Sequence, residues 1–600
     1  MMDQRNFIIA IALSAAILFG FQYFFEQPRV QQQAQQNSAQ QAGSPGAAPG
    51  AAPGAAPGAA PGVASPPGTA PRIGAPTLPG APAASAGATP AESRAAALAA
   101  SPRVRINTPR LHGSIALAGG RIDDLTLAQY HETIDPKSPE IVLLSPLGSA
   151  SPYLAEFGWV PADNSVKVPA DDTKWTASGG ELTAATPVTL SWDNGAGLVF
   201  SRVYNIDDDY MFTVKQSVTN NGGAPVTLYP YASVTRVGTP ESSSYYILFE
   251  GMIGDFNGVL KEVKYGSLKD GEPVTESSTG AWLGFTDKYW LTALVPPQEE
   301  TIRGRFTHSL VNRTDRYQAD YLDGERIVPP GGSVESAGRF FAGPKVVKLL
   351  DKYRDEFGVR SFDDAVDWGY FYFLTKPIFY ALDYFYSVIG NFGLAILLLT
   401  VIVKLLFFPL ANKSYRAMSK MKLLQPEMLK LREKYGDDKA KLNEEMMALY
   451  KRVGANPLAG CLPMVIQIPV FFSLYKVLFV TIEMRHAPFF GWIHDLSSPD
   501  PTSFANLFGL LPWDPHAVPV IGGFLAIGAW PLIMGVTMFL QQKLNPQPAD
   551  PVQAKMFMLL PIVFTYMLAS FPAGLVIYWA WNNLLTMLQQ WAIMRRAGAA

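Results

Sequence analysis

GLAILLLTVIVKLLFFPL, the stretch from Gly393 to Leu410, predicts the fold class of this chain. It is apolar and long enough to cross a bilayer as a helix, yet it carries a lysine, Lys404, inside it. A charged side chain at the bilayer centre costs roughly 2.5–3.5 kcal/mol, so it normally has a functional reason. The alternative is that the long Lys404 side chain snorkels to the interface near Ala411. We therefore expect a membrane protein in which Lys404 either lines a polar site or snorkels.

Further apolar segments toward the C-terminus predict a helical transmembrane core at 389–595. Its five expected spans are 391–410, 462–480, 522–541, 556–571 and 574–593. The segment 346–388 precedes the core and is rich in aromatic residues, which predicts a connecting helix followed by an amphipathic helix at the membrane interface. The segment Phe504–Trp513 is too short to cross and is also expected to lie at the interface.

The charged segment 412–456 predicts an antiparallel helical hairpin with one narrow apolar seam. Residues that recur at helical spacing on either side of Gly436 form this seam: Met421, Leu424, Met428, Leu431, Tyr435, Leu442, Met446, Leu449 and Val453. A methionine-rich surface that binds hydrophobic partners is the alternative to simple packing. The hairpin is rich in lysine and arginine, whereas the loop from Thr481 to Pro519 holds only Arg485. The positive-inside rule therefore places the hairpin in the cytoplasm.

Three further segments precede residue 346. Residues 1–26 contain the apolar run Phe7–Phe25 without a clear cleavage site, which predicts a transmembrane signal anchor; a cleaved signal peptide is the alternative. Residues 27–101 are rich in Ala, Pro and Gly and predict a disordered linker. Residues 102–345 contain short alternating runs separated by turn residues, which predicts an all-β sandwich outside the cytoplasm.

The sequence offers little sign of enzymatic chemistry. The single cysteine, Cys461, excludes an intramolecular disulfide, and there is no HExxH, P-loop or GxSxG motif. A sugar-binding or sugar-isomerising role for the sandwich remains an alternative, but His112, His131 and His308 have no carboxylate partner evident from the sequence. The net charge of −2 gives no attraction to nucleic acid. We expect no metal site, no cofactor and no covalent catalysis.

Polar side chains recur inside the expected spans. Thr400 lies one helical turn from Lys404, Gln467 lies within 462–480, and one side of the last span carries Tyr578, Asn582, Thr586 and Gln589. Lipid cannot satisfy such groups, so they need each other or water. Interhelical hydrogen bonding alone would explain the neutral groups. Because the spans contain no Asp or Glu, the charge of Lys404 favours a water-filled cavity, and a transporter driven through carboxylates is disfavoured.

Several of these segments resemble the YidC/Oxa/Alb family, above all IGNFGLAILLLTVIVKLLFFPL, NPLAGCLPMVIQIPVF and FPAGLVIYWAWNNLLTMLQQ. The resemblance runs almost continuously from Phe362 to Arg595 and extends more loosely to the N-terminal anchor and the sandwich. It implies a multi-domain, multi-pass protein in the inner membrane of a Gram-negative bacterium. Such a protein has an N-terminal anchor helix, a periplasmic all-β supersandwich, and a five-helix insertase core with a cytoplasmic helical hairpin.

The resemblance also implies function, partners and site residues. The expected function is insertion of nascent membrane proteins into the lipid bilayer, alone or beside the Sec translocon, with the ribosome and signal-recognition-particle pathway as further partners. The expected hydrophilic groove consists of Lys404, Thr400, Gln467, Tyr578, Asn582 and Thr586, and the expected hydrophobic slide of Ile468, Phe471 and Phe564. Arginine is usual in the family where Lys404 stands, and lysine lacks its planar donor fork. A membrane-anchored carbohydrate-active enzyme and a channel or transporter are the rival interpretations.

Overall fold

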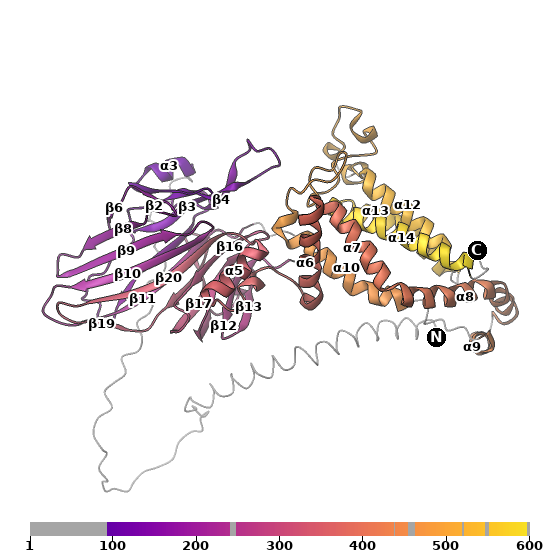
Figure 1. Cartoon of the computed structure of the whole chain (residues 1–600), viewed down its shortest axis with the longest axis horizontal. Helices are drawn as coiled ribbons and strands as arrows, with labels where there is room; N and C mark the ends of the chain where they lie inside the picture. The colour runs from indigo at the N-terminus through magenta and orange to yellow at the C-terminus, as the bar shows by residue number, and fades with distance from the viewer. Residues whose placement is uncertain are drawn as a thin grey trace, which may run out of the picture. The chain divides into compact units, whose positions relative to one another are not determined.

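The computed structural model describes residues 93–240, 248–436, 438–453, 462–518, 521–545 and 551–596 (Figure 1). The signal anchor expected at 1–26 lies outside these residues, as does the linker expected at 27–101 up to residue 92. Helix α3 (Arg94–Ala99) nevertheless lies within the linker segment, and its Arg94 forms an ion pair with Asp124. The linker boundary at 101 is therefore wrong, because residues from Ser93 onward belong to the folded part that is described.

The prediction of an all-β sandwich is confirmed. One sheet has the order β14-β17-β18-β11-β5-β3-β2-β1-β7, with β19 paired to β11 and β4 to β3, and the other has the order β13-β12-β15-β16-β20-β10-β9-β8-β6. The strands of the first sheet are β1 (Arg103–Asn107), β2 (Leu111–Ala116), β3 (Arg121–His131), β4 (Glu140–Leu144), β5 (Tyr153–Pro161), β7 (Glu181–Leu182), β11 (Val226–Val237), β14 (Val274–Thr279), β17 (Thr301–Val311), β18 (Thr314–Leu322) and β19 (Arg326–Val328). Those of the second are β6 (Thr176–Ser178), β8 (Val188–Asp193), β9 (Leu198–Ile206), β10 (Met211–Asn220), β12 (Gly251–Phe256), β13 (Val259–Val263), β15 (Trp282–Thr286), β16 (Trp290–Val295) and β20 (Ser333–Pro344).

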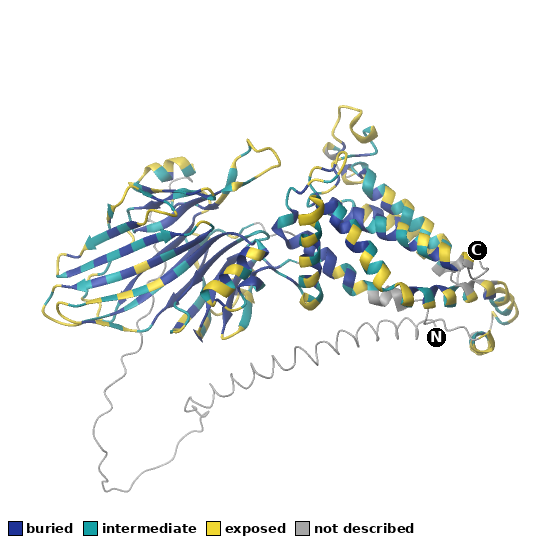
Figure 2. Cartoon of the chain, viewed as in Figure 1, coloured by how far each residue is buried: buried dark blue, intermediate teal, exposed yellow. Residues whose placement is uncertain are grey.

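The core of the sandwich lies between the inner faces of these sheets. Strand β9 alternates buried and half-buried residues along LVFSRVYNI, as expected when every second side chain points inward. The Phe157 ring on β5 contacts Tyr204 on β9 and Phe340 on β20, with ring centroids 6.5 Å apart in each pair. Aromatic side chains from both sheets thus interdigitate, and the buried residues follow the inner faces of the strands (Figure 2).

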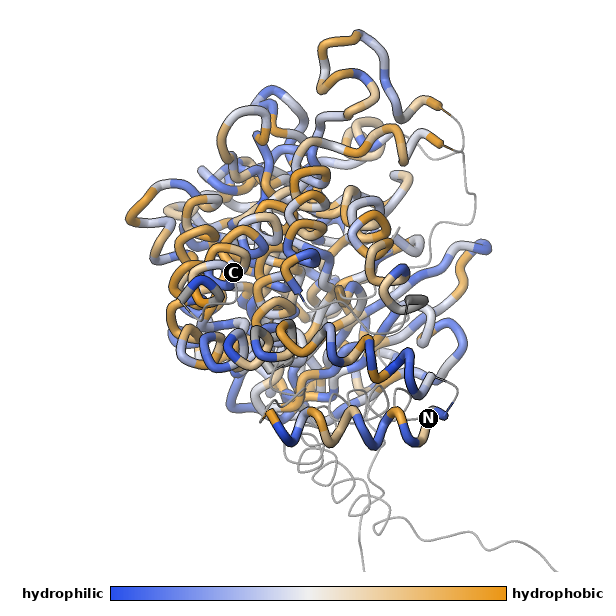
Figure 3. The backbone as a smooth tube through the Cα atoms, turned by 90° about the vertical axis from the view of Figure 1, so that its right-hand side faces the viewer, coloured by the Kyte–Doolittle hydropathy of each residue, from blue (hydrophilic) through white to orange (hydrophobic). Residues whose placement is uncertain are grey.

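The prediction of a C-terminal helical region is also confirmed. A short helix, α4 (Tyr265–Lys269), belongs to the sandwich, and the helices that follow it are α5 (Val347–Phe357), α6 (Tyr372–Ile389), α7 (Phe392–Leu406), α8 (Phe408–Tyr435), α9 (Lys439–Val453), α10 (Leu462–Val480), α11 (Gly522–Leu525), α12 (Ala529–Leu544), α13 (Pro551–Leu568) and α14 (Ala573–Arg596). Figure 3, which turns the right-hand side of Figure 1 toward the reader, shows hydrophobic and hydrophilic stretches alternating along the chain. Amphipathic helix α6 buries Thr375, Ile378, Phe379 and Leu382 and exposes several tyrosines.

Three expected spans differ from the helices that are observed. The span 391–410 is broken at Phe407, where α7 and α8 meet at 68°. Pro409 has no N–H to donate to the carbonyl of Leu405, so the helix cannot continue straight. The span 522–541 is instead the short α11 followed by α12, and the span 556–571 is α13, which runs from Pro551 to Leu568.

A helix that crosses a bilayer must be both long enough and sufficiently apolar. Among the described residues, no single helix meets both requirements for crossing a membrane alone. The bent pair formed by Phe392–Leu406 and Phe408–Met418 meets them together.

Residues 417–466 belong to a compact unit of their own and are described separately. In this unit Leu424 of α8 and Leu449 of α9 are buried against each other, with Met421, Met428, Leu431 and Tyr450 packed around them. The Tyr450 hydroxyl also donates to the sulfur of Met428 over 3.8 Å. The apolar seam therefore includes Tyr450, whereas Val453, which was expected in it, is exposed.

Candidate functional site

Lys404 lies at a polar contact between three helices. Its ammonium group donates to the hydroxyl of Thr586 on α14 over 2.8 Å and to Oε1 of Gln467 on α10 over 3.4 Å. The Gln467 amide in turn donates to Oδ1 of Asn582 over 2.8 Å. Four of the expected groove residues are thus joined in one hydrogen-bond network between α7, α10 and α14.

The geometry of α14 explains why two of its residues can share this network. Asn582 and Thr586 are four residues apart, so they lie on the same face of the helix. The Thr586 hydroxyl donates to the backbone carbonyl of Asn582 over 2.6 Å, which leaves its lone pairs available to the Lys404 ammonium. Tyr578, one turn earlier, lies on the same face of α14. Tyr578, Asn582 and Thr586 are all buried.

Thr400 takes no part in these hydrogen bonds. Its hydroxyl donates to the carbonyl oxygen of Ile396 in its own helix over 2.7 Å, as threonine often does in apolar helices. The sequence placed Thr400 on the Lys404 side of α7 but could not show that its hydroxyl is already satisfied. Its role in a groove therefore stays a prediction.

The network combines one cation with neutral groups. A hydroxyl and an amide oxygen solvate the Lys404 ammonium, and no Asp or Glu occurs anywhere in α7, α10, α12, α13 or α14. Such an arrangement keeps a positive charge available in apolar surroundings. Chemically, such a cation can bind a carboxylate or another electron-rich group.

The three expected slide residues differ in exposure. Ile468 on α10 is 44% exposed, and one turn later Phe472, which the sequence analysis did not single out, is 46% exposed. Phe471 is half-buried and packs against Trp579 of α14, with ring centroids 4.8 Å apart. Phe564 of α13 contacts the same Trp579 ring at 5.9 Å. Trp579 thus connects Phe471 to Phe564, while Ile468 and Phe472 form the outward-facing side of α10.

A second lysine in an apolar helix was missed. Lys476 of α10 forms an ion pair with Asp367, which precedes α6, and the Nζ–Oδ2 distance is 2.6 Å. Gly369 has a positive φ of 71° and lies directly against the Lys476 side chain, where an added Cβ would come within 2.8 Å of Cε. The charge was visible in the sequence of the span 462–480. Its partner was not, because Asp367 lies far away along the chain.

The sandwich histidines have structural partners. The sequence showed no carboxylates for them, yet His112 lies 3.0 Å from Glu140, and His308 lies 3.0 Å from Asp315. Asp315 is also paired with Lys269 at 2.6 Å, which fits an ion-pair cluster better than a catalytic pair. Among the described residues no group of histidine, cysteine and carboxylate side chains could hold a metal ion.

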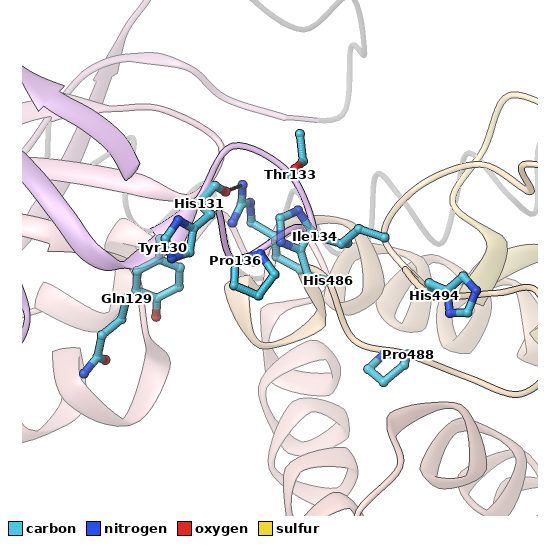
Figure 4. A pocket seen from close by; sticks show the side chains of 10 residues that line it. Gln129, Tyr130, His131, Thr133, Ile134, Pro136, His486, Pro488 and His494 are labelled. Carbon is cyan, nitrogen blue, oxygen red and sulfur yellow. Dashed lines mark hydrogen bonds between the residues drawn. The ribbon is translucent and has the colours of Figure 1, made fainter. Parts of the chain in front are cut away.

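A cavity of about 460 Å³ lies where the β3–β4 connection meets the loop after α10 (Figure 4). Its polar lining includes His131, Arg485, His486 and His494, and no carboxylate is among its lining residues. Arg485 already donates to the backbone carbonyl of His131 over 2.5 Å. Among the described residues, its histidines do not form a group that could hold a metal ion.

The comparisons with known proteins cover both regions of the chain. Residues 103–381 match the family model of the YidC periplasmic domain, and residues 384–599 match that of the 60Kd inner membrane protein. The chain is 55% identical to the membrane protein insertase YidC of Methylobacterium sp. (strain 4-46), over 99% of this chain and 96% of the relative. It is 53% identical to the protein of that name from Bradyrhizobium diazoefficiens, over 100% and 97%. A crystal structure of an active YidC insertase is similar over 81% of this chain and 91% of that chain, with 17% identity and a TM-score of 0.33.

Proposed function

The chain belongs to the family of the membrane protein insertase YidC, and on that premise we propose that the Lys404 network receives the polar segments of membrane proteins during insertion. The observation that carries this proposal is the hydrogen-bonded contact of Lys404 with Thr586 and Gln467 between three apolar helices. The substrates are nascent membrane proteins, and no covalent bond is made or broken.

The physical task of such a site is to reduce the cost of desolvation. A polar or acidic segment of the substrate must cross a medium in which each unsatisfied charge costs several kcal/mol. The Lys404 ammonium offers a countercharge, and the hydroxyl and amide groups of Thr586, Gln467 and Asn582 offer hydrogen bonds. Together they would replace part of the water that the segment loses, so its barrier to crossing falls.

The apolar segment of the same substrate needs a path into lipid. The exposed side chains Ile468 and Phe472 on α10 provide one apolar surface. Helix α13 provides another, because Leu559, Ile562 and Val563 are each more than half exposed. Phe471 and Phe564 would support these surfaces from behind through Trp579. Transfer of the substrate from the Lys404 network to lipid would then proceed along α10 and α13.

The topology follows from charge. The lysines and arginines of the hairpin at 412–456 favour a cytoplasmic position for it, and the sandwich at 102–345 would then lie in the periplasm. The protein then resides in the inner membrane with its groove open to the cytoplasm. The hairpin would receive the substrate, whether this comes from the ribosome through the signal-recognition-particle pathway or from the Sec translocon.

Site-specific photo-crosslinking tests the proposal. A photoreactive amino acid at Thr586 or Gln467 should crosslink to a stalled nascent membrane protein with an acidic segment. Leu588 is the matched control, because it lies on the same helix but is 53% exposed. Crosslinks to the polar segment from position 588 and none from positions 586 and 467 would contradict the proposed groove.

Deletion of most of the sandwich distinguishes the insertase from a carbohydrate-active enzyme. Insertion should persist when residues between Val104 and Ser333 are removed, because the network lies entirely within α7, α10 and α14. An activity that disappears with the sandwich, while the helices still assemble, would favour the enzyme instead.

A further inference from the structure

The loop before α11 exposes an unusually apolar tip. Leu510 is 82% exposed, and Leu507 and Phe508 are 53% and 50% exposed. Leu511 and Trp513 are exposed as well, and no charged residue occurs from Pro501 to Trp513. A contiguous apolar surface of this kind is rare on a part of a protein that faces water, and it normally marks a contact with lipid or a partner.

The backbone of this tip is held in a costly conformation. Leu507 and Phe508 have positive φ values of 52° and 57°, which non-glycine residues rarely adopt. Such strain persists only where the surroundings enforce it. Here Asn506 enforces it, since its side-chain oxygen accepts from the Gly509 N–H over 2.9 Å and its backbone carbonyl accepts from the Leu511 N–H over 3.0 Å. This hydrogen-bonded turn thus holds the large apolar side chains outward.

The base of the loop is fixed to the end of a predicted span. Asp500 accepts from the backbone N–H of Trp530 over 2.8 Å, and Thr502 accepts from that of Ala529 over 2.9 Å, so both cap the first turn of α12. Ser503 donates to the carbonyl of Leu525 in α11 over 2.6 Å. The apolar tip therefore lies at the N-terminal end of α12.

Aromatic contacts connect the loop to the exposed side of α13, which the proposed function assigns to lipid. Phe524 of α11 is 53% exposed and contacts both Phe504 of the loop, at 6.0 Å, and Tyr566 of α13, at 6.4 Å. Tyr566 and Ile562, which lie one turn apart on α13, are exposed too. Phe524 thus connects Phe504, in the loop before the tip, to Tyr566 on α13.

We propose that Leu507–Trp513 inserts into the headgroup region of the bilayer, beside the end of α13. Leucine, phenylalanine and tryptophan side chains without nearby basic residues suit this region. Their apolar parts can be buried there, while neighbouring polar groups stay hydrated. The lack of charge makes a rim of ion pairs with a protein partner less suitable than lipid. The leaflet is the periplasmic one, a detail that rests on the topology proposed above; the lipid contact itself does not rest on insertase activity.

Fluorescence in vesicles tests this contact. The full chain with Cys461→Ser and Leu510→Cys is labelled with an environment-sensitive dye and reconstituted into phospholipid vesicles. We expect blue-shifted emission that is largely lost when lipid carrying a nitroxide near its headgroup is included. The matched control is Leu310→Cys, because Leu310 is an equally apolar residue of the sandwich that is 67% exposed. Its dye should keep a water-like emission that the nitroxide does not quench.

The possible outcomes are distinct. Water-like, unquenched emission at position 510 would overturn the proposal, and so would a blue shift that appears only after another protein is added. Insertion of a test substrate is measured in the same vesicles. Quenching at 510 without insertion would count against the proposed function while supporting the lipid contact, and insertion without quenching would do the reverse.

Discussion

The ammonium group of Lys404 and the hydroxyl of Thr586 lie 2.8 Å apart and join α7 to α14. A lysine side chain could have reached the membrane interface instead, but this one is directed toward two polar neighbours on other helices. The hydrogen bond thus favours a polar site over snorkelling. The charge of Lys404 then becomes the first property to test.

Replacing Lys404 should affect insertion according to charge. Lys404→Arg should retain insertion, because the cation remains and gains donors. Lys404→Ala and Lys404→Glu should impair insertion, most strongly for substrates whose translocated tails are acidic. The measurement is protease protection of tails with increasing numbers of aspartates. Normal insertion of acidic tails by Lys404→Glu would refute a groove charge.

The ion pair of Lys476 with Asp367 should stabilise the contact between α10 and the segment before α6. Asp367→Asn removes this carboxylate from a mostly buried cation, which should cost on the order of 2–3 kcal/mol. The double variant Lys476→Met with Asp367→Asn should recover part of the loss, because no charge is left uncompensated. Thermal unfolding in detergent measures both. Equal melting temperatures for the wild type and Asp367→Asn would show that the pair contributes nothing.

The hairpin seam should be needed for structure, and the hairpin itself for insertion. Leu449→Ala should destabilise the hairpin by about 2–5 kcal/mol, because Leu449 is buried against Leu424. Leu429→Ala is the control, since Leu429 is half exposed. Limited proteolysis compares the two variants. Deletion of Met421 to Val453 should strongly reduce insertion, and a normal rate in that deletion would mean that the hairpin is dispensable.

Lengthening α13 should slow insertion. The helix has 18 residues, which rise about 27 Å against roughly 30 Å of hydrocarbon, so the bilayer must thin around it or flanking groups must snorkel. One added turn of leucines removes that mismatch. The bilayer would then no longer thin where the substrate crosses, so the hydrophobic barrier to the substrate would be longer. The comparison is insertion by the wild type and the lengthened variant in thin and thick lipids. An identical response of both proteins to thickness would exclude local thinning from the mechanism.

Glu483 should make stability depend on pH. Burial raises the pKa of this carboxyl from 4.5 to about 7, and its Oε1 accepts from the Val347 N–H at the start of α5 over 3.0 Å. The folded chain therefore binds the proton more tightly than the unfolded chain does. The resulting stabilisation is complete below pH of about 4.5 and is lost as the pH rises through about 7. Melting temperatures across this range should fall for the wild type and fall less for Glu483→Gln.

Lysine, glutamine and asparagine are conspicuous in apolar helices, so the sequence predicted that these groups need each other or water, and the family resemblance implied that they share one groove. It could not reveal which of them touch, since that depends on how the helices rotate against one another. Thr400 illustrates the limit, because its hydroxyl bonds within its own helix. Pro409, which causes the break at Phe407, is visible in the sequence. The stretch is apolar on both sides of it, however, so hydropathy alone predicted one continuous span. Contacts between distant segments, such as Lys476 with Asp367, left no local pattern to detect.

The neutrality of the groups around Lys404 has a consequence for turnover. A lysine locked to a carboxylate of its own chain would first have to break that ion pair before it could accept a substrate. Thr586 and Gln467 instead hold the ammonium by hydrogen bonds worth about 1.5–3 kcal/mol each, which an arriving acidic group can replace and a departing one can restore. After each substrate leaves, the hydrogen bonds of Lys404 would thus re-form spontaneously, without any need for nucleotide hydrolysis.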